Sequence, residues 1–368
     1  MRINNKSLFG ILQVALGLKC INNDLVDGFE DEEWREIFSF VSQQGVSAIA
    51  LLGIENLGMK PPHSILMKWI GVKLIVQRNF LNQQEGCRQL VALCKEERVN
   101  MLVLKGMSLT DFYPDPSIRE FGDLDVFSFP KGKAKVDFRV NEKIHDSVNR
   151  LVEGRGFAVE YWDMHDVFNY GSVHVEHHSY FVNKNSKSGR RINEVLMGMV
   201  SEEKCIKVVD GLYYPSHDFN AIYLLVHTIG HMSYEGATLK NVLDYGMFLL
   251  YYGEKVNWND VISIFEETGW TVGFNTLVRV VEKVLDVNFS CYYIGQPNEE
   301  LSVKVLNLVL ETRLHQEVNL SLIKRVVMKT RRLFSHKWMY DCGLIPANFW
   351  TECLWGSVKE HLVRPSQF

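Results

Sequence analysis

The sequence predicts an α/β fold of the α+β kind, in which a small mixed β-sheet is flanked by two helical regions. Two observations support this. Apolar residues recur at helical spacing through residues 1–98 and again from His217 onward. Between these regions, from Val99, short apolar runs alternate with turns and short helical patterns, as in a mixed sheet. We therefore expect an N-terminal helical region over 1–98, an α/β core over 99–215 and a C-terminal helical domain over 216–368.

The N-terminal region shows successive helical patterns. Apolar residues recur every three or four positions over 8–16 and over 34–41. The Pro-Pro pair at 61–62 breaks the chain and favours a new helix directly after it. Apolar spacing then continues over 66–94, so one long helix is expected to run to about Arg98.

The core pattern consists of short strands and one helix. Residues 101–104 form an apolar run consistent with a buried strand, and Pro130 ends a second strand over 123–129. Residues 108–113 between them fit a helical turn. The segments expected after Pro130 are a strand extension or short strand at 136–140, a helix at 144–152 that stops near Gly154 or Gly156, and strands at 157–161, 167–170 and 173–181.

The C-terminal domain returns to the helical period without a repeat unit. Its expected helices cover residues 217–230, 239–250, 257–267, 271–285, 299–314 and 319–334.

Composition narrows the class of protein. A hydrophobic content of 46% argues against disorder, and a net charge of -4 gives no global attraction to nucleic acid. The seven cysteines are scattered and form no C-x-x-C pair, which argues against a disulfide framework and a zinc ribbon. The N-terminus lacks a cleavage-site pattern, and no segment is apolar enough to span a bilayer. We expect a cytoplasmic protein with no membrane partner.

Two carboxylates form the most informative motif. Asp123 and Asp125 lie on the same face of the expected strand, and Leu124 and Val126 face the opposite way into a core. Paired carboxylates repel each other unless a cation lies between them, and hard oxygen ligands suit Mg²⁺ or Mn²⁺. A turn at Gly106, just upstream, would let a phosphate approach the backbone. The pattern favours metal-dependent phosphoryl or nucleotidyl transfer.

A third carboxylate would complete such a site, because two metal ions align the attacking and leaving oxygens. The best candidate is Glu176, which shares one face of an expected strand with His174 and His178. A polar strand face of this kind can equally be solvent-facing.

These motifs resemble the nucleotidyltransferase superfamily related to DNA polymerase β, in which a glycine–serine turn precedes Asp-x-Asp on a strand and a later acidic residue follows on another. The local sequence resembles the bacterial uncharacterised nucleotidyltransferase family over about residues 100–250. The matching segments are Leu104-Lys105-Gly106, Tyr113-Pro114-Asp115-Pro116, Arg119 with Gly122-Asp123-Leu124-Asp125, Glu176-His177-His178, the helical pair His227 and His231, and Lys240 with Asp244. The chain departs from the wider superfamily in having Met107 between the glycine and the serine.

The resemblance implies roles for these residues. Asp123 and Asp125 would bind Mg²⁺ or Mn²⁺ at the phosphates of a nucleoside triphosphate. Glu176 would bind a second ion and help to deprotonate the acceptor. Gly106 would let the backbone approach the triphosphate, and Ser108 would hydrogen-bond it.

Further roles follow from the same resemblance. Lys105 or Arg119 would neutralise the leaving pyrophosphate, and His178 and His231 would lie near the nucleotide. The acceptor would be an unknown hydroxyl or phosphate on a small molecule, a protein or RNA, although the sequence carries no strong nucleic-acid signal.

Each of the following residues also has a purely structural explanation. Lys105 can be a surface residue at a strand end, and Arg119 can form a salt bridge with Glu120 or Asp123. Lys240 and Asp244, four residues apart on a helix, can be a surface ion pair. The basic run of Lys324, Arg325, Lys329, Arg331, Arg332 and Lys337 is either a solvated helix face or a surface for a phosphate-rich acceptor.

Two other functions compete with an active nucleotidyltransferase. The first is a catalytically silent binding or regulatory protein that keeps the fold, which a separation of more than about 8 Å between Glu176 and the aspartates would favour. The second is a zinc hydrolase built on histidines, because two helical residues at i and i+4 can bind zinc. The histidines concerned are His165, His174, His177, His178, His227 and His231.

Overall fold

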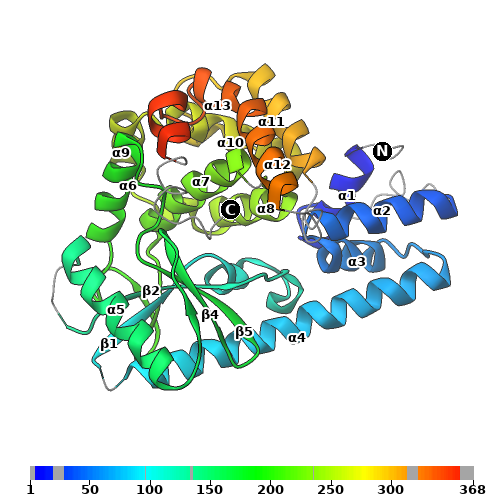
Figure 1. The fold of residues 1–368 in the computed structure, drawn as a ribbon. Coiled ribbons are helices and arrows are strands. Elements are labelled where there is room, and N and C mark those ends of the chain that lie inside the picture. The colour runs from blue at the N-terminus through cyan, green and yellow to red at the C-terminus, as the bar shows by residue number, and fades with distance from the viewer. Residues whose placement is uncertain are drawn as a thin grey trace.

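The fold is that of a computed structural model, which describes residues 5–19, 29–95, 97–132, 136–234, 236–312 and 322–356. It confirms the α/β class: helices lie on both sides of a mixed seven-stranded sheet (Figure 1). No helix within these ranges combines the length and apolar content that crossing a bilayer requires.

The N-terminal region is helical, as predicted. Its helices are α1 (Asn5–Ala15), α2 (Asp31–Gln43), α3 (Ser47–Asn56) and α4 (His63–Cys94). Helix α4 begins directly after Pro62 and runs beneath the sheet (Figure 1). It ends at Cys94 rather than near Arg98, because Arg98 takes a left-handed backbone conformation (φ 56°) that turns the chain into the first strand.

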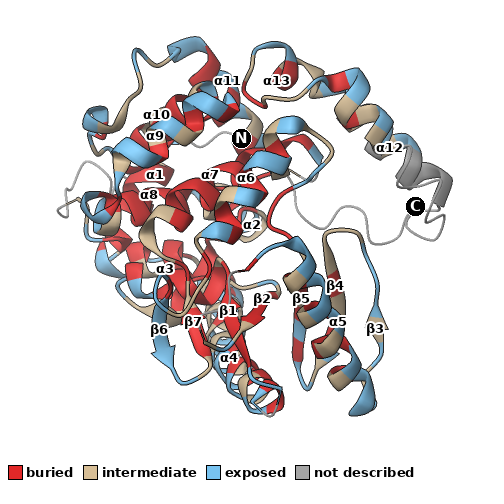
Figure 2. Cartoon of the chain, turned by 90° about the vertical axis from the view of Figure 1, so that its left-hand side faces the viewer, coloured by how far each residue is buried: buried red, intermediate tan, exposed pale blue. Residues whose placement is uncertain are grey.

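The sheet has the strand order β3-β4-β5-β2-β1-β7-β6. Its strands are β1 (Val99–Val103), β2 (Leu124–Pro130), β3 (Val159–Glu160), β4 (His165–Tyr170), β5 (Val173–His178), β6 (Ile206–Val209) and β7 (Leu212–Tyr214). Strand β2 pairs with β1 antiparallel and with β5 parallel. The buried strands β1 and β2 therefore lie at the centre of the sheet (Figure 2).

The two faces of β2 belong to different cores. Leu124 and Val126 pack with residues of α4 and of α5 (Phe138–Gly154), as the alternation predicts. Phe127 faces the other way and packs against Phe181 with the rings tilted, and Phe181 in turn contacts Phe219 at the start of α7. Asp123 and Asp125 share this second face, which points toward the C-terminal helices.

The C-terminal region is a helical assembly, as predicted. Its helices are α7 (His217–Tyr234), α8 (Leu239–Tyr252), α9 (Trp258–Thr268), α10 (Thr271–Leu285), α11 (Glu299–Glu311), α12 (Leu322–Ser335) and α13 (Lys337–Asp341). Residues 319–321 of the expected last helix lie outside the described ranges.

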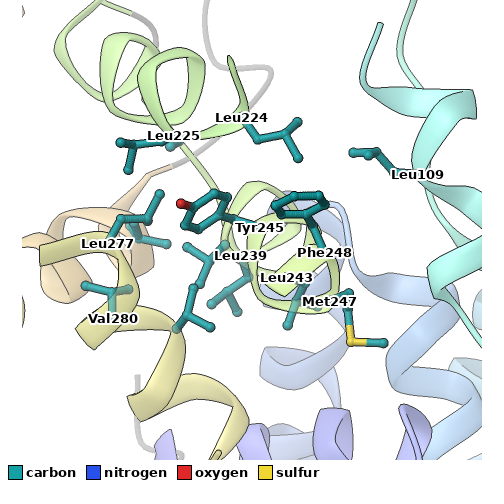
Figure 3. Packing of buried hydrophobic residues seen from close by; sticks show 14 of the residues in the cluster. Leu109, Leu224, Leu225, Leu239, Leu243, Tyr245, Met247, Phe248, Leu277 and Val280 are labelled. Carbon is teal, nitrogen blue, oxygen red and sulfur yellow. The ribbon is translucent and has the colours of Figure 1, made fainter. Parts of the chain in front are cut away.

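Helix α8 joins this assembly to the core. Phe248 on α8 faces Leu109 in the short 3-10 helix Gly106–Phe112, and Tyr245 lies on the side of α8 nearer Leu277 of α10 (Figure 3). Phe112 also contacts Phe248, with ring centroids 6.3 Å apart. Helix α8 is therefore packed against the segment that follows β1.

One segment differs from its prediction and others were not foreseen. The short strand expected at 136–140 is wrong, because Asp137 caps a helix by accepting hydrogen bonds from the N–H groups of Arg139 and Val140. Helix α6 (Lys187–Gly198) and strands β6 and β7 were not predicted. Strand β7 has only three residues, too few for an alternating pattern to show.

Candidate active site

The turn after β1 brings the side chain of Lys105 to Asp125 on the neighbouring strand β2. Lys105 (φ 31°) and Gly106 (φ 43°) both have positive φ, which bends the chain sharply into the 3-10 helix. The ammonium of Lys105 lies 2.8 Å from Oδ1 of Asp125. Ser108 closes the turn, since its N–H and hydroxyl both donate to the carbonyl of Lys105, at 2.8 and 3.0 Å. The Ser108 hydroxyl is therefore used within the turn.

The register of the sheet brings the three carboxylates together. Asp125 on β2 is paired with Glu176 on the parallel strand β5, so both side chains point to the same face. Asp123 lies just before β2, two residues from Asp125. Each of the three offers a carboxylate oxygen within 4.8 Å of the others.

Asp125 is the buried member of this group. Its side chain is 3% exposed, and His178 donates to its Oδ1 at 3.0 Å. Burial opposes ionisation, but the Lys105 ammonium and His178 outweigh it and hold the pKa of Asp125 well below its usual range. The carboxylate is therefore ionised at any ordinary pH.

The pKa values of His178 and Glu176 are both raised, for different reasons. Burial alone would lower the pKa of His178, but hydrogen bonds to Asp125 and Glu176 raise it to about 9. Burial raises the pKa of Glu176 to about 7, helped by the nearby charges of Asp125 and Asp123 and opposed by His178. Glu176 is thus poised near neutrality, where a carboxylate can accept and release a proton.

Open carboxylate oxygens remain for a cation. Both contacts of Asp125 fall on Oδ1, and no described residue hydrogen-bonds its Oδ2. Asp123 has no hydrogen bond or ion pair to the described part of the chain. Hard carboxylate oxygens suit Mg²⁺ or Mn²⁺, so the donor set of Asp123, Asp125 and Glu176 fits such an ion.

A cavity of about 250 Å³ opens in front of the two aspartates. Lys105, Gly106, Arg119, Asp123 and Asp125 form its sheet side. Its opposite wall comes from α7 and α8 and contains His227, Thr228, His231, Lys240 and Asn241. Ser108, Glu176 and His178 are not part of this lining.

Arg119 connects the sheet to α8. Its guanidinium donates to both oxygens of Asp244, at 2.9 and 2.7 Å, and the Tyr113 hydroxyl donates to the same carboxylate at 2.7 Å. All three side chains are buried. The alternative pairing of Arg119 with the carboxylate of Glu120 or Asp123 is therefore wrong.

The proposed surface pair of Lys240 with Asp244 is also wrong. Asp244 is buried and its oxygens are engaged by Arg119 and Tyr113. Glu120 has a separate role, since its carboxylate accepts from the N–H groups of Ser47 and Ala48 at the start of α3. Sequence reasoning missed the polar cavity residues Thr228, Thr238 and Asn241. For Thr238 and Asn241 the signal was the run 238–241, Thr-Leu-Lys-Asn, which forms the capping box of α8.

The histidines divide between the two faces of the sheet. His165 and His178 both approach Glu176, with Nε2 atoms 3.6 and 3.7 Å from its oxygens, and these three can also hold a metal ion. His177 lies on the opposite face, bonded to Ser128 and stacked on His145. His227 and His231 contact each other across the cavity wall, with ring centroids 4.2 Å apart. A single zinc site that gathers all the histidines is therefore excluded.

The basic C-terminal run is only partly visible. The side chains of Lys324, Arg325 and Lys329 lie outside the described part of the structure. Lys337 pairs with Asp341 at 2.6 Å on the same helix, as a solvated face would.

The comparisons with known proteins agree with the site geometry. No curated protein and no solved structure matches the chain. A family model described as "Uncharacterised nucleotidyltransferase" matches residues 30–286, which is more than half of the chain. The match takes in β1, β2, β5 and both helices of the cavity wall. The chain therefore belongs to this uncharacterised nucleotidyltransferase family.

Proposed function

We propose that this protein transfers a nucleoside monophosphate from a nucleoside triphosphate to a hydroxyl or phosphate acceptor, in a reaction that needs a divalent cation. One observation carries the proposal: Asp125 and Glu176 are paired in register and Asp123 lies beside them, with carboxylate oxygens within 4.8 Å. This spacing favours an active enzyme over the silent binding protein, for which a wide separation was expected.

Asp123, Asp125 and Glu176 would hold Mg²⁺ or Mn²⁺, which supplies charge stabilisation to the phosphates and acidifies the acceptor hydroxyl. Lys105 and His178 keep Asp125 ionised, so it is always ready to act as a ligand. The remaining catalysis consists of positioning and electrostatics.

The acceptor and the triphosphate meet at the three carboxylates. An acceptor oxygen forms a bond to the α-phosphorus while the bond from that phosphorus to the bridging oxygen breaks and pyrophosphate leaves. Glu176 takes the proton of an acceptor hydroxyl as the general base. Gly106 leaves space for a phosphate, since a Cβ placed there would meet only Arg119 Nη1, at 3.9 Å.

The test is to incubate the purified protein with each nucleoside triphosphate and Mg²⁺, and to measure pyrophosphate release and labelling of the protein from α-labelled nucleotide. Asp123→Asn should abolish Mg²⁺-dependent nucleotide binding while the fold persists. Asp210→Asn is the matched control, because Asp210 is exposed on the turn beyond β6. Unchanged nucleotide binding in Asp123→Asn would overturn the proposal.

A further inference from the structure

The cavity is lined by two lysines and one arginine, and two of these three cations already lie against a carboxylate. Lys105 is 2.8 Å from Asp125, and Arg119 makes a two-pronged contact with Asp244. Lys240, on the opposite wall, forms no ion pair with any residue that the structure describes. An added anion would therefore meet its least compensated positive charge at Lys240.

The environment of Lys240 is arranged to hold its side chain in place. A Cβ at Gly45 would lie 3.4 Å from Cβ and Cδ of Lys240, so the aliphatic stem packs against the backbone between α2 and α3. Burial and the Arg119 guanidinium lower the pKa of Lys240, and the carboxylates of Asp244, Asp123 and Glu120 offset this only in part. A bound anion would therefore stabilise the charged form of Lys240.

The backbone at the start of α8 is not available for that anion. The N–H of Leu239 donates to the Gln44 side chain, and that of Lys240 to the Gln44 carbonyl. The N–H of Asn241 donates to the Thr238 carbonyl. An anion at this wall must therefore be held by side chains.

Neutral donors line the same cavity as Lys240. Burial, reinforced by the charge of Lys105, holds the pKa of His227 well below its usual range, so His227 is a neutral imidazole. The carbonyl oxygen of Asn241 receives the N–H and hydroxyl of Thr238, and its NH₂ group is bonded to no described residue. One cation with amide and imidazole donors is a typical phosphate-binding set.

We propose that Lys240 binds the β- and γ-phosphates of the nucleoside triphosphate, so that Lys240, rather than Lys105 or Arg119, neutralises the leaving pyrophosphate. This assignment rests on the proposed function. The triphosphate would then cross the cavity, with its α-phosphate at the aspartates on the sheet and its far end at α8. Nucleoside monophosphates, which lack the far end, would gain nothing from Lys240.

The test uses inorganic tripolyphosphate with Mg²⁺, because this probe needs no knowledge of the preferred base. Its binding to the full chain is measured by titration calorimetry for wild type, Lys240→Met and Lys240→Arg, with folding checked by circular dichroism. Loss of a charge-assisted contact should weaken binding roughly 10- to 100-fold in Lys240→Met. Lys240→Arg should stay within a few-fold of wild type. Lys207→Met, on the exposed strand β6, is the matched control and should bind like wild type.

The outcomes separate this inference from the proposed function. Equal affinity of wild type and Lys240→Met, or no binding to wild type, overturns the role of Lys240. Weak binding in Lys240→Met together with no nucleotide turnover by wild type supports the phosphate site and counts against the transferase. Normal turnover by wild type with equal affinity in Lys240→Met leaves the transferase standing and removes Lys240 from it.

Discussion

The two aspartates of the Asp-x-Asp motif should respond very differently to the same substitution. Asp125 is 3% exposed, and its Oδ1 receives Lys105 at 2.8 Å and His178 at 3.0 Å. Asp125→Asn leaves a buried ammonium without its counter-ion, which costs about 3–5 kcal/mol of unfolding free energy. Asp123 is partly exposed and has no partner in the described chain, so Asp123→Asn should change stability by no more than about 0.5 kcal/mol.

The two variants should be alike in how little Mg²⁺ stabilises them. If all three carboxylates hold the ion, wild type gains about 2.7 kcal/mol when Mg²⁺ is at 100 times its dissociation constant. Both variants should lose most of this gain, because each removes a charged ligand. Asp123→Asn thus separates metal binding from folding.

The assay is urea unfolding followed by circular dichroism and tryptophan fluorescence, in EDTA and in Mg²⁺. Comparison of the denaturant slopes checks that the same unfolding transition is compared. Equal losses for the two variants in EDTA would refute the burial argument. A full magnesium gain in Asp123→Asn would refute the assignment of Asp123 as a ligand.

Two further predictions concern pH and packing. In metal-free protein, the pKa of His178 is about 9 in the folded state against 6.5 unfolded, so its stabilisation is complete below pH 6.5 and is lost as pH rises through about 9. His178→Gln should cost about 3 kcal/mol at pH 6 and much less at pH 9.5 by urea unfolding, and a cost independent of pH would contradict this. A Cβ on Gly53 would lie 2.1 Å from the carbonyl oxygen of Ile11, so Gly53→Ala should destabilise the α1–α3 crossing by about 1–3 kcal/mol. Gly71→Ala on α4 meets nothing within 4 Å and should instead stabilise by about 0.5–1 kcal/mol, and thermal melts that rank the two variants the other way would refute the packing argument.

Local patterns in the sequence were enough to predict much of the fold. Long helices such as α4 carry several turns of apolar spacing, and Pro62 marks its start. The alternation around Leu124 correctly assigned the two faces of β2. Strand β7 was not predicted because its three residues are too few to show a period. The strand at 136–140 was predicted wrongly because Asp137 caps a helix there, which overrides the apolar pattern.

For the candidate site, the sequence predicted which side chains of one strand share a face, but not the contacts between different elements. The pairing of Asp125 with Glu176 depends on a register set by the whole sheet, so the sequence could nominate Glu176 but not fix its distance. The pairing of Arg119 with Asp244 could not be predicted from the sequence, because Asp244 follows 125 positions later and lies on a helix of another region. Lys240 was read as a surface residue for the same reason: its neighbours come from elements distant in the chain.

The Arg119–Asp244 contact also determines when the site can form during synthesis, because its two partners are far apart in the chain. A ribosome adding roughly 5–20 residues per second needs about 6–25 s to pass from one partner to the other. During that interval the nascent chain contains both aspartates but lacks the α8 wall that would enclose a nucleotide. The proposed nucleotide site is therefore complete only after α8 has been synthesised and has docked.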